Sequence, residues 1–323
     1  MSKRARVAAI FPGQGSQLVG MGVDVAANDA GAKRLFERAA GLLGYDLLAL
    51  VSTGSDEALR ETKVSQPAIF VTNVALYTAV GELLAPVVTA GHSFGEFCSL
   101  TVSGALSFDD AVRVVDQRGR AMQAAADVVP GGMSAVLGLD AQTIRDVVAT
   151  VREGTGLRVQ LANFNSPTQI VISGDLEGVR IAGEAMLAAG AKRVVALNVS
   201  GAWHSALMEP AIDRFAQAVA DATFALPRFD VIGNVDAQPY RDTATIERNL
   251  VASITDEVRW HETAERLLSY DLDLVVEFGA SPVLGPLMKR MPGAPDATSV
   301  GDFAGVIKLR EKLAALQGDA VEV

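Results

Sequence analysis

One short run, Gly91–Gly95 with the sequence Gly-His-Ser-Phe-Gly, constrains the fold of this chain more than any other segment. It follows the apolar stretch Val87–Ala90, which predicts a buried strand, and a helix is predicted to begin directly after it. A serine on so tight a corner needs glycine on both sides, because neighbouring elements crowd the turn. We interpret Ser93 as a candidate nucleophile. An ordinary glycine-rich turn is the competing interpretation, and the flanking strand and helix disfavour it.

The corner also predicts where negative charge can be stabilised and which residue serves as base. The backbone N–H of Phe94 lies at the start of the predicted helix, where it can donate to an oxyanion. A serine nucleophile needs a proton acceptor, usually histidine near neutral pH, and the chain has three. His92 should be turned away by the corner, and His261, at a predicted helix start, is interpreted as a surface or packing residue. Elimination favours His204, in a small-residue loop before a helix predicted over 206–220, although a lone histidine is more often structural.

A helix predicted over 108–126 has a charged residue on its apolar face. Arg118 lies three residues after Val115 and four before Met122, both on the apolar stripe. A buried guanidinium is costly unless a carboxylate pairs with it, so either an internal Asp or Glu or a substrate carboxylate is expected. Spacing alone favours the internal partner. If a ligand is the partner, bidentate geometry favours a planar carboxylate.

The order of predicted elements indicates an α/β fold. A strand at Val7–Phe11 and a helical stretch that opens at Gln66-Pro67 precede the corner. Between about Gly131 and Asn198 the predicted elements follow the order β-α-β-β-α-β, which is typical of a ferredoxin-like unit. We therefore predict a ferredoxin-like small subdomain over 129–199, inserted in a large α/β subdomain made of 1–128 and 200–317, and a frayed tail over 318–323.

Within the predicted small subdomain, the sequence gives three local expectations. The strands at 158–161 and 170–172 are joined by a polar turn over 163–169. Asp140 and Asp175 each precede a helical pattern, so both are expected to be N-caps.

Composition excludes several classes of function. The net charge of −10 over 323 residues argues against nucleic acid or an anionic membrane as a partner. The single cysteine, Cys98, cannot form an internal disulfide. The apolar run after the basic start is too short for a signal peptide, and no segment approaches a membrane-spanning length. We expect a cytoplasmic protein.

Between about residues 6 and 290, short motifs occur in the same order as in one known family. They are Phe11–Gln17, Gly91–Glu96, Arg118-Gly119, Met122-Gln123, Asn163–Pro167, Val171–Gly174, Gly201–Ser205, Val258–Trp260 and Glu277–Gly279. The chain resembles the malonyl-CoA:acyl-carrier-protein transacylases, including the free-standing acyltransferases that serve polyketide synthases. The resemblance implies an α/β-hydrolase-like large subdomain with the ferredoxin-like insert.

The resemblance also implies a mechanism. Ser93 would take an acyl group from coenzyme A as an ester and pass it to a phosphopantetheine thiol, with His204 as base. The backbone N–H groups of Gln14 and Phe94 match the oxyanion hole of the family. Arg118 matches the arginine that binds the malonyl carboxylate, which reverses the preference for an internal partner. We expect an acyl carrier protein and malonyl-CoA as partners, no metal, no cofactor besides the coenzyme A thioester substrate, and a monomer.

Four positions depart from the family pattern. Phe94 replaces a usual leucine and Trp203 a usual phenylalanine, and both positions border the acyl pocket in the family. The larger Trp203 should exclude α-branched malonates, and Phe94 should reshape the pocket. In the family, the main-chain carbonyl of a glutamine often holds the histidine, and Ser253 occupies that position here. Because a main-chain carbonyl is present whatever the side chain, Ser253 is expected to keep this role. Glu257 occupies a position where proline is common.

Alternative functions stay open at this point. Transfer of another extender unit and an editing acyl hydrolase both use the same scaffold, although such hydrolases tend to lack the carboxylate-binding arginine. An inactive docking protein is disfavoured by intact Ser93, His204 and Arg118. The pairs Lys192-Arg193 and Lys289-Arg290 are candidate docking patches for an acidic carrier protein, but solvated surface charge is the slightly favoured interpretation. The sequence does not distinguish a fatty-acid from a polyketide pathway.

Overall fold

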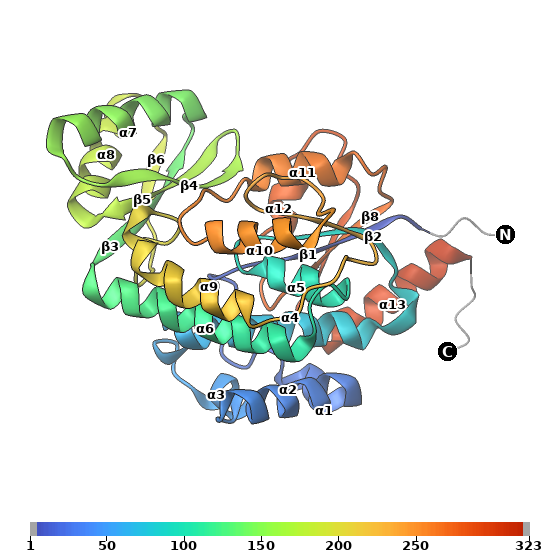
Figure 1. Cartoon of the computed structure of the whole chain (residues 1–323). Coiled ribbons are helices and arrows are strands. Elements are labelled where there is room, and N and C mark those ends of the chain that lie inside the picture. Colours follow the sequence, from blue (N-terminus) through green and yellow to red (C-terminus); the bar gives the residue numbers. More distant parts are fainter. Residues whose placement is uncertain (1–4, 319–323) are drawn as a thin grey trace.

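The computed structural model describes residues 5–318, which form a mixed α/β fold (Figure 1). Helices cover a parallel sheet, and a second, antiparallel sheet lies beside it with two helices of its own. Apart from Gly318, the tail predicted over 318–323 lies outside the described residues, and so does the basic start, residues 1–4. None of the helices in the described range has the combined length and apolarity of a transmembrane span.

The larger sheet is the centre of the molecule. Over residues 5–318 it contains five strands in the order β7-β2-β1-β8-β9, and each neighbouring pair is parallel. The strands are β1 (Val7–Phe11), β2 (Pro86–Gly91), β7 (Asp230–Ile232), β8 (Leu274–Phe278) and β9 (Ala297–Val300). All residues of β1 and β8 are buried, as expected for strands covered on both faces. The strands predicted at 7–11 and 87–90 are confirmed.

Alternate residues of β1 enter two separate hydrophobic cores, because successive side chains of a strand point to opposite faces. Val7, Ala9 and Phe11 belong to the larger core, whereas Ala8 and Ile10 belong to the smaller one. The helices of the larger core are α1 (Val23–Asn28), α2 (Ala30–Leu43), α3 (Leu47–Thr53), α4 (Thr62–Val80), α5 (Gly95–Val102), α6 (Phe108–Val128), α9 (Ile212–Ala220), α10 (Thr243–Ala252) and α13 (Phe303–Gln317). Those of the smaller core are α11 (Trp260–Leu268) and α12 (Gly285–Met288). Short 3₁₀ segments are η1 (Ala58–Arg60), η2 (Gly81–Leu83) and η3 (Ala206–Ala211).

Local sequence explains most, but not all, of the helix boundaries. The Ser107 hydroxyl caps α6 by accepting a hydrogen bond from the Asp110 N–H at 3.1 Å. α4 begins four residues before the predicted start at Gln66-Pro67, so that proline lies inside the helix instead of in its first turn. Burial of α4 on nearly all sides compensates for the hydrogen bond that proline cannot donate. The helix predicted over 206–220 is divided into η3 and α9, with Pro210 just before the division.

The middle of the chain builds the smaller sheet. Its elements are β3 (Gly131–Leu137), α7 (Ala141–Thr155), β4 (Val159–Ser166), β5 (Gln169–Asp175), α8 (Leu176–Ala188) and β6 (Arg193–Ala196). The strand order is β4-β5-β3-β6 and the neighbouring pairs are antiparallel. α7 and α8 enclose a third hydrophobic core against this sheet. The predicted succession β-α-β-β-α-β is therefore present along the chain.

The polar turn predicted over 163–169 is wrong. β4 continues to Ser166 and β5 begins at Gln169, so only two residues connect them. The polar segment stays extended because it has backbone partners outside its own sheet. The Phe164 N–H donates to the Val258 carbonyl at 2.9 Å, and the Val258 N–H donates to the Ala162 carbonyl at 2.8 Å.

The two aspartates expected to cap helices behave differently. Asp140 caps α7 by accepting a hydrogen bond from the Thr143 N–H at 3.0 Å. Asp175 precedes α8 but makes no side-chain cap, which corrects the sequence prediction. Its carboxylate instead accepts from the backbone N–H and the guanidinium of Arg158, a charge-assisted pairing that outcompetes the cap.

Parallel pairing brings the carboxyl ends of β1, β2 and β7 to one edge of the larger sheet. The segments that follow these ends contain Gln14, Ser93 and Asn234. β4 of the smaller sheet reaches the same region through a bridge between Asn163 and Val258. Ligand sites of open α/β sheets lie at such an edge, so a site is expected there.

Candidate active site

Ser93 lies on a strained corner between β2 and α5, as the sequence predicts. Its φ of 52° is in the left-handed region that residues other than glycine adopt at a cost. A Cβ at Gly91 would meet the backbone of Gly95 at 2.0 Å, and a Cβ at Gly95 would meet the Phe11 carbonyl oxygen at 2.4 Å. The two glycines are therefore required by the close approach of β1, β2 and α5.

The histidine chosen by elimination meets the serine. His204 Nε2 lies 2.8 Å from Ser93 Oγ, and its Nδ1 lies 3.1 Å from the Asp256 carbonyl oxygen. Because a carbonyl oxygen only accepts, Nδ1 carries the proton and Nε2 is free to accept from the serine hydroxyl. Burial, and then the positive charge of Arg118, lower the pKa of His204 to about 3. The imidazole is therefore neutral near pH 7 and able to act as a base.

The carbonyl that orients His204 differs in part from the expectation. The hydrogen bond from Nδ1 goes to the carbonyl of Asp256, three residues beyond Ser253 in the same loop. The Ser253 carbonyl also acts on the imidazole and raises its pKa. Gln160 holds this arrangement together: its Nε2 donates to the His204 carbonyl at 3.2 Å and to the Thr255 carbonyl at 3.1 Å. The sequence interpretation did not include Asp256 or Gln160.

Two backbone donors lie beside this pair. Among residues 5–318, neither the Gln14 N–H nor the Phe94 N–H donates a hydrogen bond within the protein. The Gln14 side chain is anchored separately, by a hydrogen bond from Nε2 to Thr62 Oγ1 at 3.2 Å. Unused backbone donors of this kind are suited to a developing oxyanion.

Arg118 points its guanidinium at the nucleophile. The side chain is 1% exposed, and Nη2 lies 3.4 Å from Ser93 Oγ. Nε and Nη1 are buried without a hydrogen-bond partner, and Arg118 forms no ion pair within the described part of the chain. Burial lowers its pKa to about 10, while the charge of Glu96 acts in the opposite direction. The internal carboxylate partner that spacing alone favours is therefore not in contact with Arg118.

These residues line a small cavity of 90 Å³. That volume is well below the roughly 300–1,000 Å³ of a typical ligand pocket, so the space suits a compact group. Its lining residues are Gln14, Gln66, His92, Ser93, Arg118, Met122, Met133, Asn163, Leu197, Val199, Trp203 and His204. Trp203 borders the cavity as expected, and its indole Nε1 is buried without a partner.

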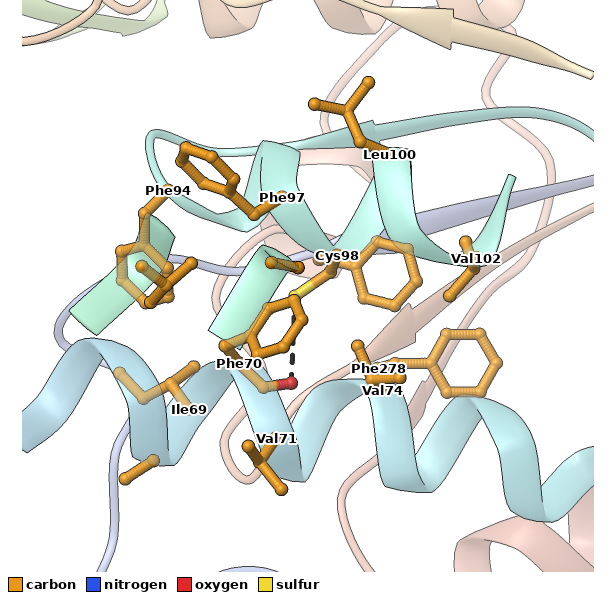
Figure 2. Packing of buried hydrophobic residues seen from close by; sticks show 14 of the residues in the cluster. Ile69, Phe70, Val71, Val74, Phe94, Phe97, Cys98, Leu100, Val102 and Phe278 are labelled. Carbon is orange, nitrogen blue, oxygen red and sulfur yellow. Dashed lines mark hydrogen bonds between the residues drawn. The ribbon is translucent and has the colours of Figure 1, made fainter. Parts of the chain in front are cut away.

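Phe94 does not line this cavity, which corrects the expectation for its side chain. It is 1% exposed and belongs to the larger hydrophobic core. Figure 2 shows its ring in that core with Phe97 and Cys98 of α5 and with residues of α4. The corner turns Ser93 toward the cavity and therefore turns the next side chain into the core. Only the backbone of Phe94 is available to the site.

The other two histidines have structural partners. His92 Nε2 lies 2.9 Å from Asn165 Oδ1, and His92 lines the same cavity as Ser93. The ring of His261 lies 5.3 Å from that of Phe164, and its Nε2 lies 3.5 Å from Glu265. The contacts of His261 agree with its interpretation as a surface or packing residue.

An α/β fold with a serine–histidine pair at the carboxyl ends of its parallel strands defines a class of proteins suited to nucleophilic acyl transfer. Comparisons narrow that class. A family model described as acyl transferase domain matches residues 9–306. A malonyl CoA-acyl carrier protein transacylase of Salmonella typhimurium is 40% identical over 301 residues, which cover 92% of this chain and 96% of that protein. The chain belongs to the acyl transferase domain family.

Two further relatives connect the fold with polyketide synthesis. The polyketide biosynthesis protein ThaF of Burkholderia thailandensis is 40% identical over 285 residues, 87% of this chain and 24% of that protein. A solved complex of a type II polyketide synthase acyl-carrier protein with its malonyl-transacylase contains a chain that matches with a TM-score of 0.90 and 39% identity. The match covers 95% of this chain and 100% of that one.

Proposed function

We propose that this acyltransferase moves a malonyl group from coenzyme A to the phosphopantetheine thiol of an acyl carrier protein. The observation that carries the proposal is Arg118, a buried guanidinium with unused donors beside Ser93 Oγ. The 40% identity to a malonyl CoA-acyl carrier protein transacylase over nearly the whole chain supports it.

The acyl group would be carried as an ester on Ser93. His204 takes the hydroxyl proton as Oγ attacks the thioester carbonyl, and the N–H groups of Gln14 and Phe94 stabilise the oxyanion. Collapse of the tetrahedral intermediate breaks the C–S bond, and the imidazolium returns its proton to the leaving thiolate of coenzyme A. The phosphopantetheine thiol then attacks the ester by the same steps in reverse, which gives ping-pong kinetics.

Arg118 and Trp203 would set the acyl specificity. A malonyl carboxylate can satisfy the unused guanidinium donors, whereas an acetyl group leaves them unpaired in a buried site, at a cost. The indole ring of Trp203 narrows a cavity that is already small, so α-branched malonates should fit poorly.

The alternative functions are weaker. An editing hydrolase has no need for a carboxylate-binding arginine, and an inactive docking protein has no need for the bonded Ser93–His204 pair. Transfer of another extender unit is the closer alternative, because Trp203, which lines the cavity, replaces the phenylalanine that is usual in the family. Relatives in both fatty-acid and polyketide contexts leave either pathway as the setting.

The finer description of the architecture belongs to the same proposal. The strand orders support an α/β-hydrolase-like large subdomain, 1–128 with 200–317, and a ferredoxin-like small subdomain over 129–199. We also keep as proposals a monomeric state, no metal, and no cofactor beyond the coenzyme A thioester substrate. The expected lack of nucleic-acid and membrane partners and the cytoplasmic location stay predictions from the sequence.

Intact-protein mass spectrometry tests this function. The protein is incubated with malonyl-, methylmalonyl-, acetyl- and butyryl-CoA, and the adduct is then chased with a holo carrier protein. We expect a malonyl adduct that is lost in Ser93→Ala and that moves to the carrier protein. Preferential loading of acetyl or butyryl groups would contradict malonyl transfer. A malonyl adduct that is released only to water would support the hydrolase.

A further inference from the structure

The buried side chain of Asn234 forms hydrogen bonds with both the backbone N–H and the backbone carbonyl of Ser93. Asn234 Oδ1 accepts a hydrogen bond from the Ser93 N–H at 3.1 Å, and Asn234 Nδ2 donates to the Ser93 carbonyl at 3.0 Å. Asn234 is 3% exposed and follows β7, the strand that pairs with β2. Because β2 and β7 are parallel, their carboxyl ends bring Ser93 and Asn234 together across 141 positions of sequence.

A second buried layer fixes the orientation of this amide. The Glu96 carboxylate accepts from Asn234 Nδ2 at 2.5 Å and from the Asn234 backbone N–H at 3.4 Å. The Tyr240 hydroxyl donates to the other oxygen of Glu96. Glu96 and Tyr240 are 1% and 3% exposed, and Glu96 forms no ion pair within residues 5–318. If the amide were reversed, its NH₂ group would face the Ser93 N–H, and its oxygen would face Glu96 Oε2. Ser93 and Glu96 together therefore favour one orientation.

Holding the Ser93 carbonyl also fixes the direction of an oxyanion donor. In a planar trans peptide the C=O and the following N–H point in opposite directions. The Ser93 carbonyl accepts from Asn234 Nδ2 and from the Glu96 N–H, the latter at 3.1 Å. The Phe94 N–H belongs to the same peptide plane, so it is directed away from these donors. Rotation of that plane, which changes ψ of Ser93 and φ of Phe94, would misalign the N–H.

We propose that Asn234 is a positioning residue for both the nucleophile and the Phe94 oxyanion donor, and that Glu96 and Tyr240 hold its amide in the working orientation. The inference depends on the proposed function only in taking Ser93 as the nucleophile. None of the three residues lines the cavity that contains Arg118. Loss of the Asn234 amide should therefore lower the rate of attack by Ser93 and leave the binding of the acyl carboxylate unchanged.

The test measures two reactions of Ser93 in the full-length protein. The first is phosphonylation by a fluorophosphonate, in which Oγ bonds to phosphorus, fluoride leaves and His204 takes the proton. The second is single-turnover acylation by malonyl-CoA, with rate and apparent Kd read from its concentration dependence. Asn234→Asp keeps the shape but removes the Nδ2 donor, and Asn234→Ala removes both contacts. We expect each to lower both rates about 10- to 100-fold, since misplacing a reacting group by about 1 Å costs up to 100-fold, with unchanged Kd.

Matched variants separate positioning from general destabilisation. Val306→Ala removes buried volume from the larger hydrophobic core on α13, away from this network, and should keep wild-type rates despite a loss of Tm. Glu96→Gln keeps an acceptor for the Asn234 amide and should retain activity that Glu96→Ala loses. If Asn234 variants do not fold, Tyr240→Phe should still slow phosphonylation about 3- to 10-fold, as expected for loss of one supporting hydrogen bond.

The outcomes are distinct. Wild-type phosphonylation rates in Asn234→Asp, or in Tyr240→Phe where the former does not fold, would overturn the inference. A rate loss in Val306→Ala equal to that in Asn234→Ala would also overturn it, because the effect would then follow stability alone. If the wild type forms no malonyl adduct but phosphonylation depends on Asn234 as expected, the proposed substrate fails and the positioning role stands.

Discussion

Replacing Arg118 by methionine should make the protein more stable and less selective at once. Methionine is unbranched, fits the same buried path on α6 and carries no charge. In the free protein Nε and Nη1 of Arg118 are buried without partners. An unsatisfied buried donor costs about 1–3 kcal/mol, so removing both should stabilise the fold by about 2 kcal/mol after some loss of packing. For a chain of this size, that raises Tm by about 2–4 °C.

Activity should change in the opposite direction. A hydrogen bond to a charged group is worth about 1.5–3 kcal/mol, so losing a bidentate carboxylate contact should lower kcat/KM for malonyl-CoA by about 10²- to 10³-fold. Acetyl-CoA makes no such contact, and its kcat/KM should change by less than about tenfold, since only shape changes at the site.

Single-turnover acylation with the two thioesters and differential scanning calorimetry give the necessary numbers. Arg120→Met is the matched control, because Arg120 lies on the same helix but is 40% exposed and paired with Asp116. Removing that surface pair should leave selectivity unchanged and lower stability by about 0.5 kcal/mol. Wild-type selectivity in Arg118→Met, or a clear fall in its Tm, would show that Arg118 stabilises the fold and does not bind substrate.

Three further predictions concern the cavity wall, the buried carboxyl and the surface. Trp203→Phe enlarges the cavity and should raise the ratio of methylmalonyl to malonyl loading about tenfold, as one methylene in a pocket is worth 1–3 kcal/mol; an unchanged ratio in the mass spectrum would mean that Trp203 does not exclude the branch. Burial raises the pKa of Glu96 from 4.5 to about 7, so between these pH values the folded state holds a proton that the unfolded state releases. This proton contributes about 3 kcal/mol to stability. The contribution is complete below pH 4.5 and is lost as the pH rises to 7. Glu96→Gln should remove it, and parallel pH profiles of Tm for the two proteins would refute the assignment. Reversing the charges of Lys192-Arg193 and Lys289-Arg290 should raise KM for the carrier protein alone, and unchanged kinetics would exclude these exposed pairs as the docking surface.

The parts of the site that were predictable have a local signature. Five consecutive residues, with a predicted strand before them and a predicted helix after them, were enough to predict the corner at Ser93. Arg118 is visible because helical periodicity makes a charge on an apolar stripe conspicuous. His204 required only that few histidines compete for the role. In each case the physical constraint acts over a few neighbouring residues, so the sequence contains it.

The parts that were missed depend on long-range placement. Asn234 meets Ser93 only because β7 pairs with β2, and no local pattern states which strands are neighbours. The short apolar run Val231-Ile232, followed by Gly233-Asn234, is the one local signal that was present. The inward direction of the Phe94 ring and the choice of the Asp256 carbonyl follow from backbone angles at two tight turns. Such angles are determined by packing from several elements and cannot be obtained from residue type.

The strand order β7-β2-β1-β8-β9 has a consequence for how the protein matures. The nucleophile belongs to the first third of the chain, but the strands that flank its neighbour β1 include β8, which comes from the last sixth. His204, Asn234 and Asp256 also arrive late in synthesis. In a ribosome-bound chain, Ser93 is therefore synthesised long before the groups that make it reactive. The time at which Ser93 begins to react with a fluorophosphonate would then report when the late segments of the chain have folded around it.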